Sequence, residues 1–221
     1  MNIFDIIGPV MVGPSSSHTA GAARIAAVTR KLLGEDVKYA VIKLHGSFAN
    51  TYKGHGTDRA IIGGLLGYKV DNPAIRESFK HARDAGLIYS FETADLGDVH
   101  PNTALIKATG VSGRKIEVMG CSVGGGRIII KRIDNFQVEF TGKYFTLVIE
   151  HRDKPGLIAA VTSVLGQNSI NIAEMRVYRS YRGGSAVMII ETDQEIFKGL
   201  IEQIKKLPEV YSVVGIEAVE I

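Results

Sequence analysis

The chain has 221 residues, of which 45% are apolar and 22% are charged, close to the average of soluble globular proteins. A chain of this length buries most of its surface on folding, so a disordered chain, a collagen-like repeat and a disulfide scaffold are excluded. Its 26 Lys and Arg residues against 23 Asp and Glu give a formal charge of +3. The basic residues are scattered, and we expect no nucleic-acid partner.

Two further features of the composition concern membranes and metals. The longest uncharged stretch, Ile6 to Ala23, holds two prolines, three serines and a histidine, whereas a spanning helix needs about 20 mostly apolar residues. No basic cluster precedes the first apolar residues, as it would in a signal peptide. Cys121 is the only cysteine, which excludes an internal disulfide, fits a reducing compartment and cannot alone hold an iron–sulfur cluster. We expect a soluble, cytoplasmic protein with no membrane partner, and any metal ligands beyond His and carboxylates must come from another chain.

The first part of the chain predicts a mixture of helices and strands. Apolar residues at helical spacing predict a helix from Thr19 to Leu33, with Gly34 just beyond its end. Thr57 is placed to cap a helix that runs to Leu66, and Asn72-Pro73 opens a third helix that Gly86 closes. Strands are expected over 37–44, 87–91, 103–108, 115–119 and 127–133.

A change in glycine use marks a domain boundary. Nineteen of the 25 glycines lie in residues 1–142 and six in 143–221. A Thr141-Gly142-Lys143 break follows the strand-like segment 135–140, in which apolar and polar residues alternate. We therefore predict one domain over 1–142 and a second over 143–221.

The second part predicts a βαββαβ unit. Strand 144–150 is followed by a turn over 151–156, in which Pro155 suits the first position of a helix, and by helix 157–167. Strands 171–178 and 185–192 form a hairpin around Gly183-Gly184, and a helix over 194–206 leads to strand 210–216. This order is that of the ferredoxin-like split unit, so the fold class of the whole chain is α/β (α+β).

Five consecutive polar residues, Ser15 to Thr19, precede the first helix. They are either a helix cap with its approach loop or a small-anion site, because N–H groups at a helix N-terminus and hydroxyls beside them bind carboxylates or phosphates. His18, with an ordinary pKa of about 6.5, would then be placed for proton transfer. Adjacent residues of a helix point in different directions, so we expect no Ser17–His18 pair of the serine-hydrolase kind.

Other polar clusters are weaker signals. They are His45-Gly-Ser47 at a strand end, Gly54-His-Gly-Thr-Asp58 before a helix, and His100-Pro-Asn-Thr103, where Asn102 either binds a ligand or closes a turn. The run Gly120-Cys-Ser-Val-Gly-Gly-Gly126 lies between two strands and lacks a Gly-Lys-Ser/Thr ending, which favours a hairpin turn over a phosphate loop.

Together these segments resemble the β subunit of bacterial iron–sulfur-dependent L-serine dehydratase, over essentially the whole chain. The resemblance rests on Phe4 to Thr19, Leu44-His-Gly-Ser47, Lys53-Gly-His-Gly-Thr-Asp58, His100-Pro-Asn102 and Ser122-Val-Gly-Gly-Gly126. The first domain is also similar to the allosteric substrate-binding domain of some D-3-phosphoglycerate dehydrogenases, and residues 144–221 resemble an ACT domain, a regulatory amino-acid-binding module.

The resemblance implies a function shared between two chains. An α subunit carries the cysteines that hold a [4Fe–4S] cluster, whose open iron acts as Lewis acid on the hydroxyl of L-serine, and the products are pyruvate and ammonia. It implies catalytic roles for His18 and Ser17 and substrate binding by Ser15, Ser16, Ser17, Thr19 and Asn102. The base that removes the α-proton stays open, including whether it lies on the α chain.

In the ACT part, the resemblance implies an effector site at the first strand-to-helix turn and the start of the following strand. Its candidates are His151, Asp153, Gly156 and Asn171, with Asp153 available to an amino group. A plain turn in a domain that forms homodimers through its sheet edges is an equal alternative. For the whole chain, the rival hypotheses are a free-standing amino-acid sensor without a catalytic partner and, less favoured, a nucleotide-binding regulator built on the glycine run.

Overall fold

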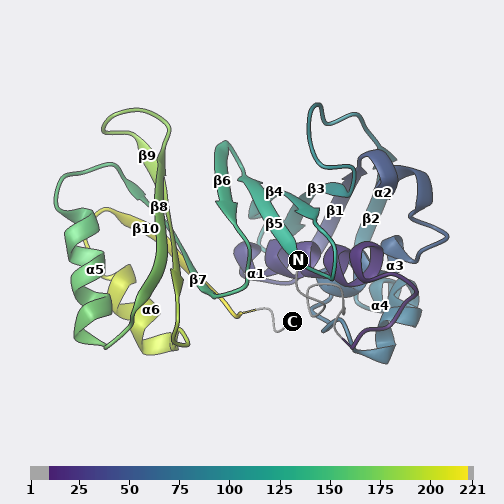
Figure 1. The fold of residues 1–221 in the computed structure, drawn as a ribbon, viewed down its shortest axis with the longest axis horizontal. Helices are drawn as coiled ribbons and strands as arrows, with labels where there is room; N and C mark the ends of the chain where they lie inside the picture. The colour runs from purple at the N-terminus through teal and green to yellow at the C-terminus, as the bar shows by residue number, and fades with distance from the viewer. Residues whose placement is uncertain (1–9, 219–221) are drawn as a thin grey trace. The chain divides into compact units, whose positions relative to one another are not determined.

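The computed structural model describes residues 10–218, and the chain forms two compact units, the first ending at Asp134 and the second beginning at Asn135 (Figure 1). The residues of the Phe4–Thr19 block up to Pro9 lie outside the described residues. The limits that we predict for the two domains, 1–142 and 143–221, stay a prediction.

The first unit is a sheet with helices on one face. In chain order its elements are η2 (Ser16–Gly21), α1 (Ala22–Leu33), β1 (Val37–Leu44), α2 (Gly46–Thr51), α3 (Thr57–Leu65), η3 (Pro73–Glu77), α4 (Ser78–Asp84), β2 (Ile88–Thr93), β3 (Thr103–Gly110), β4 (Lys115–Ser122) and β5 (Ile128–Ile133). The strands form a six-stranded sheet in the order β2-β1-β3-β4-β5-β6, whose last strand, β6 (Phe136–Phe140), follows Asp134 in the chain. The β1–β2 pair is parallel, and the pairs β1–β3, β3–β4 and β4–β5 are antiparallel.

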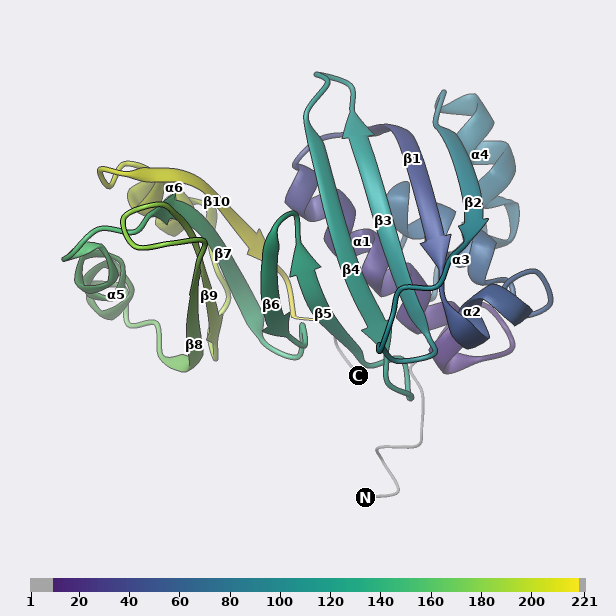
Figure 2. The same cartoon turned by 90° about the horizontal axis from the view of Figure 1, so that it is seen from above.

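The core of the first unit lies between this sheet and its helices. Figure 2 shows α1 and α3 behind the sheet, and they contact each other while α1 contacts β3 and β4. Ile25 and Leu33 of α1, Ile42 of β1, Ile106 of β3 and Ile130 of β5 are all fully buried. The apolar spacing that predicts the first helix is therefore the spacing of its buried face.

The helices of the first unit differ from the prediction in their starts. The first helix opens with a π-helical turn, η2, before α1, and α2 was not predicted. Thr57 is not a cap: Gly56, with φ 67°, precedes α3, and no side chain caps it. The third helix is confirmed, with the Asn72 side chain accepting from Ala74 N at 2.9 Å, although its first part is a 3₁₀ turn. The glycine run is the predicted hairpin, since it joins the paired strands β4 and β5.

The second unit begins with β6 (Phe136–Phe140) and continues as the predicted βαββαβ unit. Its further elements are β7 (Phe145–Arg152), α5 (Leu157–Gln167), β8 (Ile172–Arg179), β9 (Ser185–Thr192), α6 (Lys198–Lys205) and β10 (Val210–Ile216). Four strands form an antiparallel sheet in the order β10-β7-β9-β8. The helices pack on one face of this sheet, where Val161 and Leu165 of α5 and Ile204 of α6 join a buried apolar cluster.

Three details of the second unit correct the prediction. β7 extends through Arg152, so His151 belongs to the strand and not to the turn. Gly156, and not Pro155, directly precedes α5. α6 begins at Lys198 instead of Gln194, because the Gln194 side chain accepts the Asn171 N–H at 2.7 Å and its carbonyl accepts the Thr192 hydroxyl at 2.9 Å. These bonds hold residue 194 beside the strands.

Candidate functional site

Several polar segments of the first unit meet at one edge of its sheet. β1 ends at Leu44, β3 begins at Thr103 and β4 ends at Ser122, and because these neighbouring strands are antiparallel, the three ends lie together (Figure 2). Three backbone hydrogen bonds join the connections at this edge: His45 N to Thr103 O at 3.0 Å, Phe48 N to Pro101 O at 3.3 Å and Ser122 N to Asn102 O at 3.0 Å.

The serine–histidine segment enters this edge through η2. Ser15 is the N-cap, and its Oγ accepts from the His18 N–H at 3.3 Å. The His18 Nδ1 lies 3.1 Å from Ser17 Oγ and 3.3 Å from Ser15 Oγ, and these two hydroxyls are 3.3 Å apart. The expectation that Ser17 and His18 point apart is wrong, because in this π-helical turn the imidazole folds back onto the hydroxyls before it.

The second ring nitrogen of His18 is held from a different element. His18 Nε2 lies 3.1 Å from Oγ of Ser47, in the first turn of α2. The edge of the His18 ring meets the buried Phe48 ring at a centroid distance of 5.3 Å. Hydroxyl groups therefore contact both ring nitrogens, and an apolar ring supports the imidazole.

His55 is a second imidazole beside His18, from the connection that leads into α3. The two ring centroids are 4.7 Å apart. Burial, and then the repulsion of His55, lower the pKa of His18 from its ordinary value of 6.5, so His18 is neutral at pH 7 and able to accept a proton. The Thr19 hydroxyl donates to the His55 carbonyl at 3.2 Å, which ties η2 to this connection.

Four buried polar atoms on these segments have no hydrogen-bond partner within residues 10–218: His55 Nδ1, Thr57 Oγ1, Asn102 Oδ1 and Ser122 Oγ. Thr57 and Ser122 are fully buried residues. Buried polar atoms are normally paired in a folded protein, so these are the groups that a small polar ligand could engage at the sheet edge.

The structure thus brings most of the predicted substrate-binding residues together. Ser15, Ser17, His18 and Thr19 belong to one hydrogen-bonded turn, and Asn102 lies at the same sheet edge through its bond to Ser122. Ser16 lies in the same turn.

Two residues of the site were discounted at the level of sequence. Ser47 and His55 lie in the clusters His45-Gly-Ser47 and Gly54-His-Gly-Thr-Asp58, which are weak signals because a histidine in a loop is usually only solvated or capping. The signal that could have found them is their position, each one to three residues from the end or start of a buried element and next to glycine.

The candidate effector residues of the second unit make contacts of a different kind. The Asp153 carboxylate accepts from Gly183 N at 3.0 Å and from Arg179 at 3.3 Å; the Gly183 hydrogen bond chiefly, with help from Arg179, lowers its pKa. Asn171 donates from Nδ2 to Asp193 at 2.6 Å. Asp153 and Asn171 thus bond to separate segments, the β8–β9 hairpin tip and the end of β9.

His151, near the end of β7, and Gly156, just before α5, lie on either side of Asp153 in the chain. His151 is 2% exposed, its Nδ1 contacts the Arg152 carbonyl at 2.8 Å, and its Nε2 is buried without a partner in the described part of the chain. Gly156 has φ 89°, and a Cβ there would meet nothing within 4 Å. Of these candidates, His151 therefore offers a buried Nε2, and Gly156 offers open space beside its backbone.

The donor set of the described residues does not fit a metal cluster. Within residues 10–218, no three His, Cys, Asp or Glu side chains lie close enough together to hold a metal ion. Cys121 lies in β4 and is 4% exposed. We therefore assign no step of the chemistry to a metal group held by these residues. In the same range, no helix is long and apolar enough to cross a membrane.

Fold and site define a two-domain α/β protein in which a hydroxyl–imidazole site is followed by an ACT domain. The family model described as serine dehydratase beta chain matches residues 2–92, and the ACT domain model matches residues 145–209. The chain is 44% identical to the probable L-serine dehydratase beta chain of Bacillus subtilis over 215 residues, 97% of each chain. The chain belongs to the serine dehydratase β-chain family.

The chain is also similar to two other proteins. It is 40% identical to the L-serine dehydratase beta chain of Peptoniphilus asaccharolyticus over 198 residues, 89% of each chain. It is also 26% identical to the D-3-phosphoglycerate dehydrogenase of Bacillus subtilis over 194 residues, which are 87% of this chain but 36% of that enzyme. This chain is thus similar to about a third of a longer enzyme of another name.

Proposed function

We propose that the chain is the β subunit of a [4Fe–4S]-dependent L-serine dehydratase that converts L-serine to pyruvate and ammonia with a separate α subunit. The cysteine ligands of the cluster come from the α subunit, in keeping with the single buried cysteine of this chain. The observation that carries the proposal is the imidazole of His18, whose two nitrogens contact the hydroxyls of Ser17 and Ser47 at 3.1 Å.

In this proposal the β chain binds the amino acid and moves a proton. The hydroxyls of Ser15, Ser16 and Ser17 bind the substrate carboxylate, helped by the backbone N–H groups of the turn. Thr19 joins them when its hydroxyl turns from the His55 carbonyl to the substrate. The Asn102 amide takes a second polar group of the substrate. Loss of water from serine requires removal of the α-proton, and the neutral His18 accepts or relays it, with Ser17 fixing the ring and passing the proton.

The chain alone should form no pyruvate from L-serine, and addition of the cluster-loaded α subunit under anaerobic conditions should restore the reaction. A His18→Gln chain should still assemble, by size-exclusion chromatography, but lose activity by about 10²-fold or more. His81→Gln, on α4, is the matched histidine control and should keep parental activity. Full activity of the assembled His18→Gln enzyme would remove His18 from the mechanism.

A second proposal concerns the ACT domain: it binds an amino-acid effector at His151, Asp153, Gly156 and Asn171 and forms homodimers when the chain is isolated. The buried Nε2 of His151, which has no hydrogen-bond partner among the residues that the structure describes, supports it. Calorimetric titration of the isolated chain with L-serine, compared between the parent and His151→Phe, tests it. If serine binds the chain tightly while no α chain ever associates, a free-standing serine sensor is the correct function. A cytoplasmic location stays a prediction.

A further inference from the structure

His45 lies beside the candidate site, and the proposed function gives its side chain no role. It is the last residue before α2, yet its side chain makes no capping bond to that helix. Instead the imidazole, which is 18% exposed, turns toward residues 94–102, the β2–β3 connection. Its Nδ1 accepts the Leu96 N–H at 3.2 Å. Figure 2 shows this connection passing the end of β1 and the start of α2.

The Leu96 bond holds the middle of the β2–β3 connection. Backbone bonds to the end of β1 and to α2 hold the two ends of the connection. Between them, residues 95–100 bond to other residues of the connection and to the start of β3. Among the hydrogen bonds of residues 10–218, the one between Leu96 and His45 alone joins this stretch to another part of the first unit.

The last part of the connection extends this support to Asn102. The His100 Nδ1 accepts the Asn102 N–H at 3.1 Å, and the His100 carbonyl accepts the Thr103 hydroxyl at 2.6 Å. The buried Oδ1 of Asn102 has no partner in the described part of the chain, and in the proposed function this side chain binds a polar group of the substrate. A shift of residues 95–100 would therefore move the turn from which Asn102 reaches the substrate.

We propose that His45 is a positioning residue: by accepting the Leu96 N–H, it holds the β2–β3 connection in the place from which Asn102 binds the amino acid. This inference rests on the proposed function, which puts L-serine at this edge of the sheet. The role needs a lone pair on Nδ1, and therefore the neutral imidazole with its proton on Nε2.

The Asp95 carboxylate is the other group near this nitrogen. Its Oδ1 lies 3.8 Å from His45 Nδ1, but the Asp95 side chain is 89% exposed, and ion pairs of such exposure contribute little. The same Oδ1 accepts the Gly97 N–H at 2.9 Å. The bond from the Leu96 N–H is therefore the contact by which His45 holds the connection.

The segment that begins with His45 serves His18 through a different side chain. Ser47, two residues further on, contacts His18 Nε2 at 3.1 Å. Loss of the acceptor at residue 45 leaves that hydroxyl in place, so substrate binding should suffer more than proton transfer. A higher KM with little change of kcat is the kinetic sign of such a loss.

The first experiment is amide hydrogen exchange by NMR on the full chain, read at Leu96. In His45→Leu, which removes the acceptor, this amide should exchange about three- to tenfold faster, the equivalent of one hydrogen bond, while amides of the β1–β3 ladder change less than about twofold. His45→Asn places an acceptor oxygen near the position of Nδ1 and should keep the parental rate. Asp95→Asn removes the charge but keeps an acceptor for Gly97, and this matched control should leave the Leu96 rate unchanged.

The second experiment measures pyruvate formation by the assembled enzyme. His45→Leu should raise the KM for L-serine about fivefold, with kcat within about twofold of the parent, and His45→Asn should restore the parental KM. An unchanged Leu96 exchange rate, an equal effect of Asp95→Asn, or a loss of kcat that His45→Asn does not rescue would overturn the positioning role. An unchanged KM in His45→Leu, with an active parent, would overturn it as well. A parent complex that forms no pyruvate would instead refute the proposed function, and the exchange rates would still show whether His45 holds the connection.

Discussion

Replacing Gly21 with alanine should force η2 away from β4. A Cβ at residue 21 would lie 2.1 Å from Ser122 Oγ and 2.6 Å from Ser122 Cβ, well inside the 3.4–4 Å of ordinary contact. Ser122 is fully buried, so its side chain has no solvent to turn into. The turn and the strand must separate by roughly 1 Å, and overpacking of this kind costs about 1–3 kcal/mol of folding free energy.

A second substitution at Ser122 tests whether this contact is the cause. Ser122→Ala removes Oγ but keeps Cβ, so it should relieve Gly21→Ala only in part. Ser122→Gly removes both atoms, and its own cost is about 0.5–1 kcal/mol for a glycine within a strand. The double variant Gly21→Ala/Ser122→Gly should therefore be more stable than the sum of the two single effects, by about 1–2 kcal/mol of coupling.

The assay is a urea series followed by hydrogen-exchange mass spectrometry of peptides from α1 and β4, because it reports on the first unit alone. In the assembled enzyme, pyruvate formation should fall with Gly21→Ala by up to about 10²-fold, the effect of misplacing a catalytic group by 1 Å. If Gly21→Ala unfolds within about 0.5 kcal/mol of the parent, or the cycle shows no coupling, the close contact is not what positions the turn.

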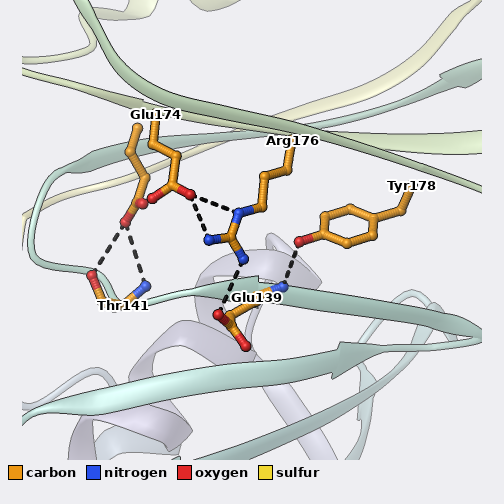
Figure 3. Close-up of polar contacts among 6 residues, drawn as sticks. Glu139, Thr141, Glu174, Arg176 and Tyr178 are labelled. Atoms are coloured by element: carbon orange, nitrogen blue, oxygen red, sulfur yellow. Dashed lines mark hydrogen bonds and ion pairs between the residues drawn. The ribbon is translucent and has the colours of Figure 1, made fainter.

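Three further predictions follow from the same structure. His55→Gln should raise the pKa of His18 toward 6.5, because it removes the repulsion that adds to burial; NMR titration of the His18 ring measures it, and an unchanged pKa would contradict the assignment. Because the folded-state pKa of His18 is lowered, its neutral form stabilises the fold above pH 6.5, and this contribution is lost as pH falls through the lowered value. Burial raises the pKa of Glu191, so the free energy of unfolding of the parent should fall as pH rises above 4.5 through the raised pKa. Glu191→Gln keeps an acceptor for Thr141 (Figure 3) and should lack this fall when unfolding is measured as a function of pH. Parallel pH profiles of the parent and the variant would refute the prediction. Leu165→Ala should destabilise the second unit by about 2–5 kcal/mol, because Leu165 is fully buried in the cluster beneath α5 and the substitution leaves a cavity, as urea unfolding followed by circular dichroism would show.

Much of the fold was predictable because its elements obey local rules. The predicted strands 37–44 and 210–216 agree with β1 and β10 residue for residue. The apolar residues of these strands and the turn residues that flank them are recognisable in the sequence alone. The start of α6 was not predictable. Gln194 reads as a helix residue, but its side chain and carbonyl are taken by Asn171 and Thr192, and such tertiary bonds override propensity.

The serine–histidine segment of the site was predictable from the sequence, but its contacts with other segments were not. The run from Ser15 to Thr19 is unusual enough to be noticed alone, whereas Ser47 and His55 become informative only once the antiparallel order of β1, β3 and β4 brings their loops to one sheet edge. A residue 29 positions away along the chain holds His18 Nε2, and no local pattern encodes such a pairing.

The hydroxyl shell of His18 also limits which proton movements are open to it. Each ring nitrogen already contacts a hydroxyl, and a hydroxyl both donates and accepts, so the ring can change tautomer without moving while Ser17 and Ser47 turn their protons. Such a ring can take a proton on one side and release it on the other. A relay of this kind needs the neutral imidazole, and burial, together with His55, favours that form by lowering the pKa of His18. In the proposed mechanism, two imidazoles 4.7 Å apart therefore have a use, because their repulsion favours the unprotonated His18 that accepts the substrate's proton.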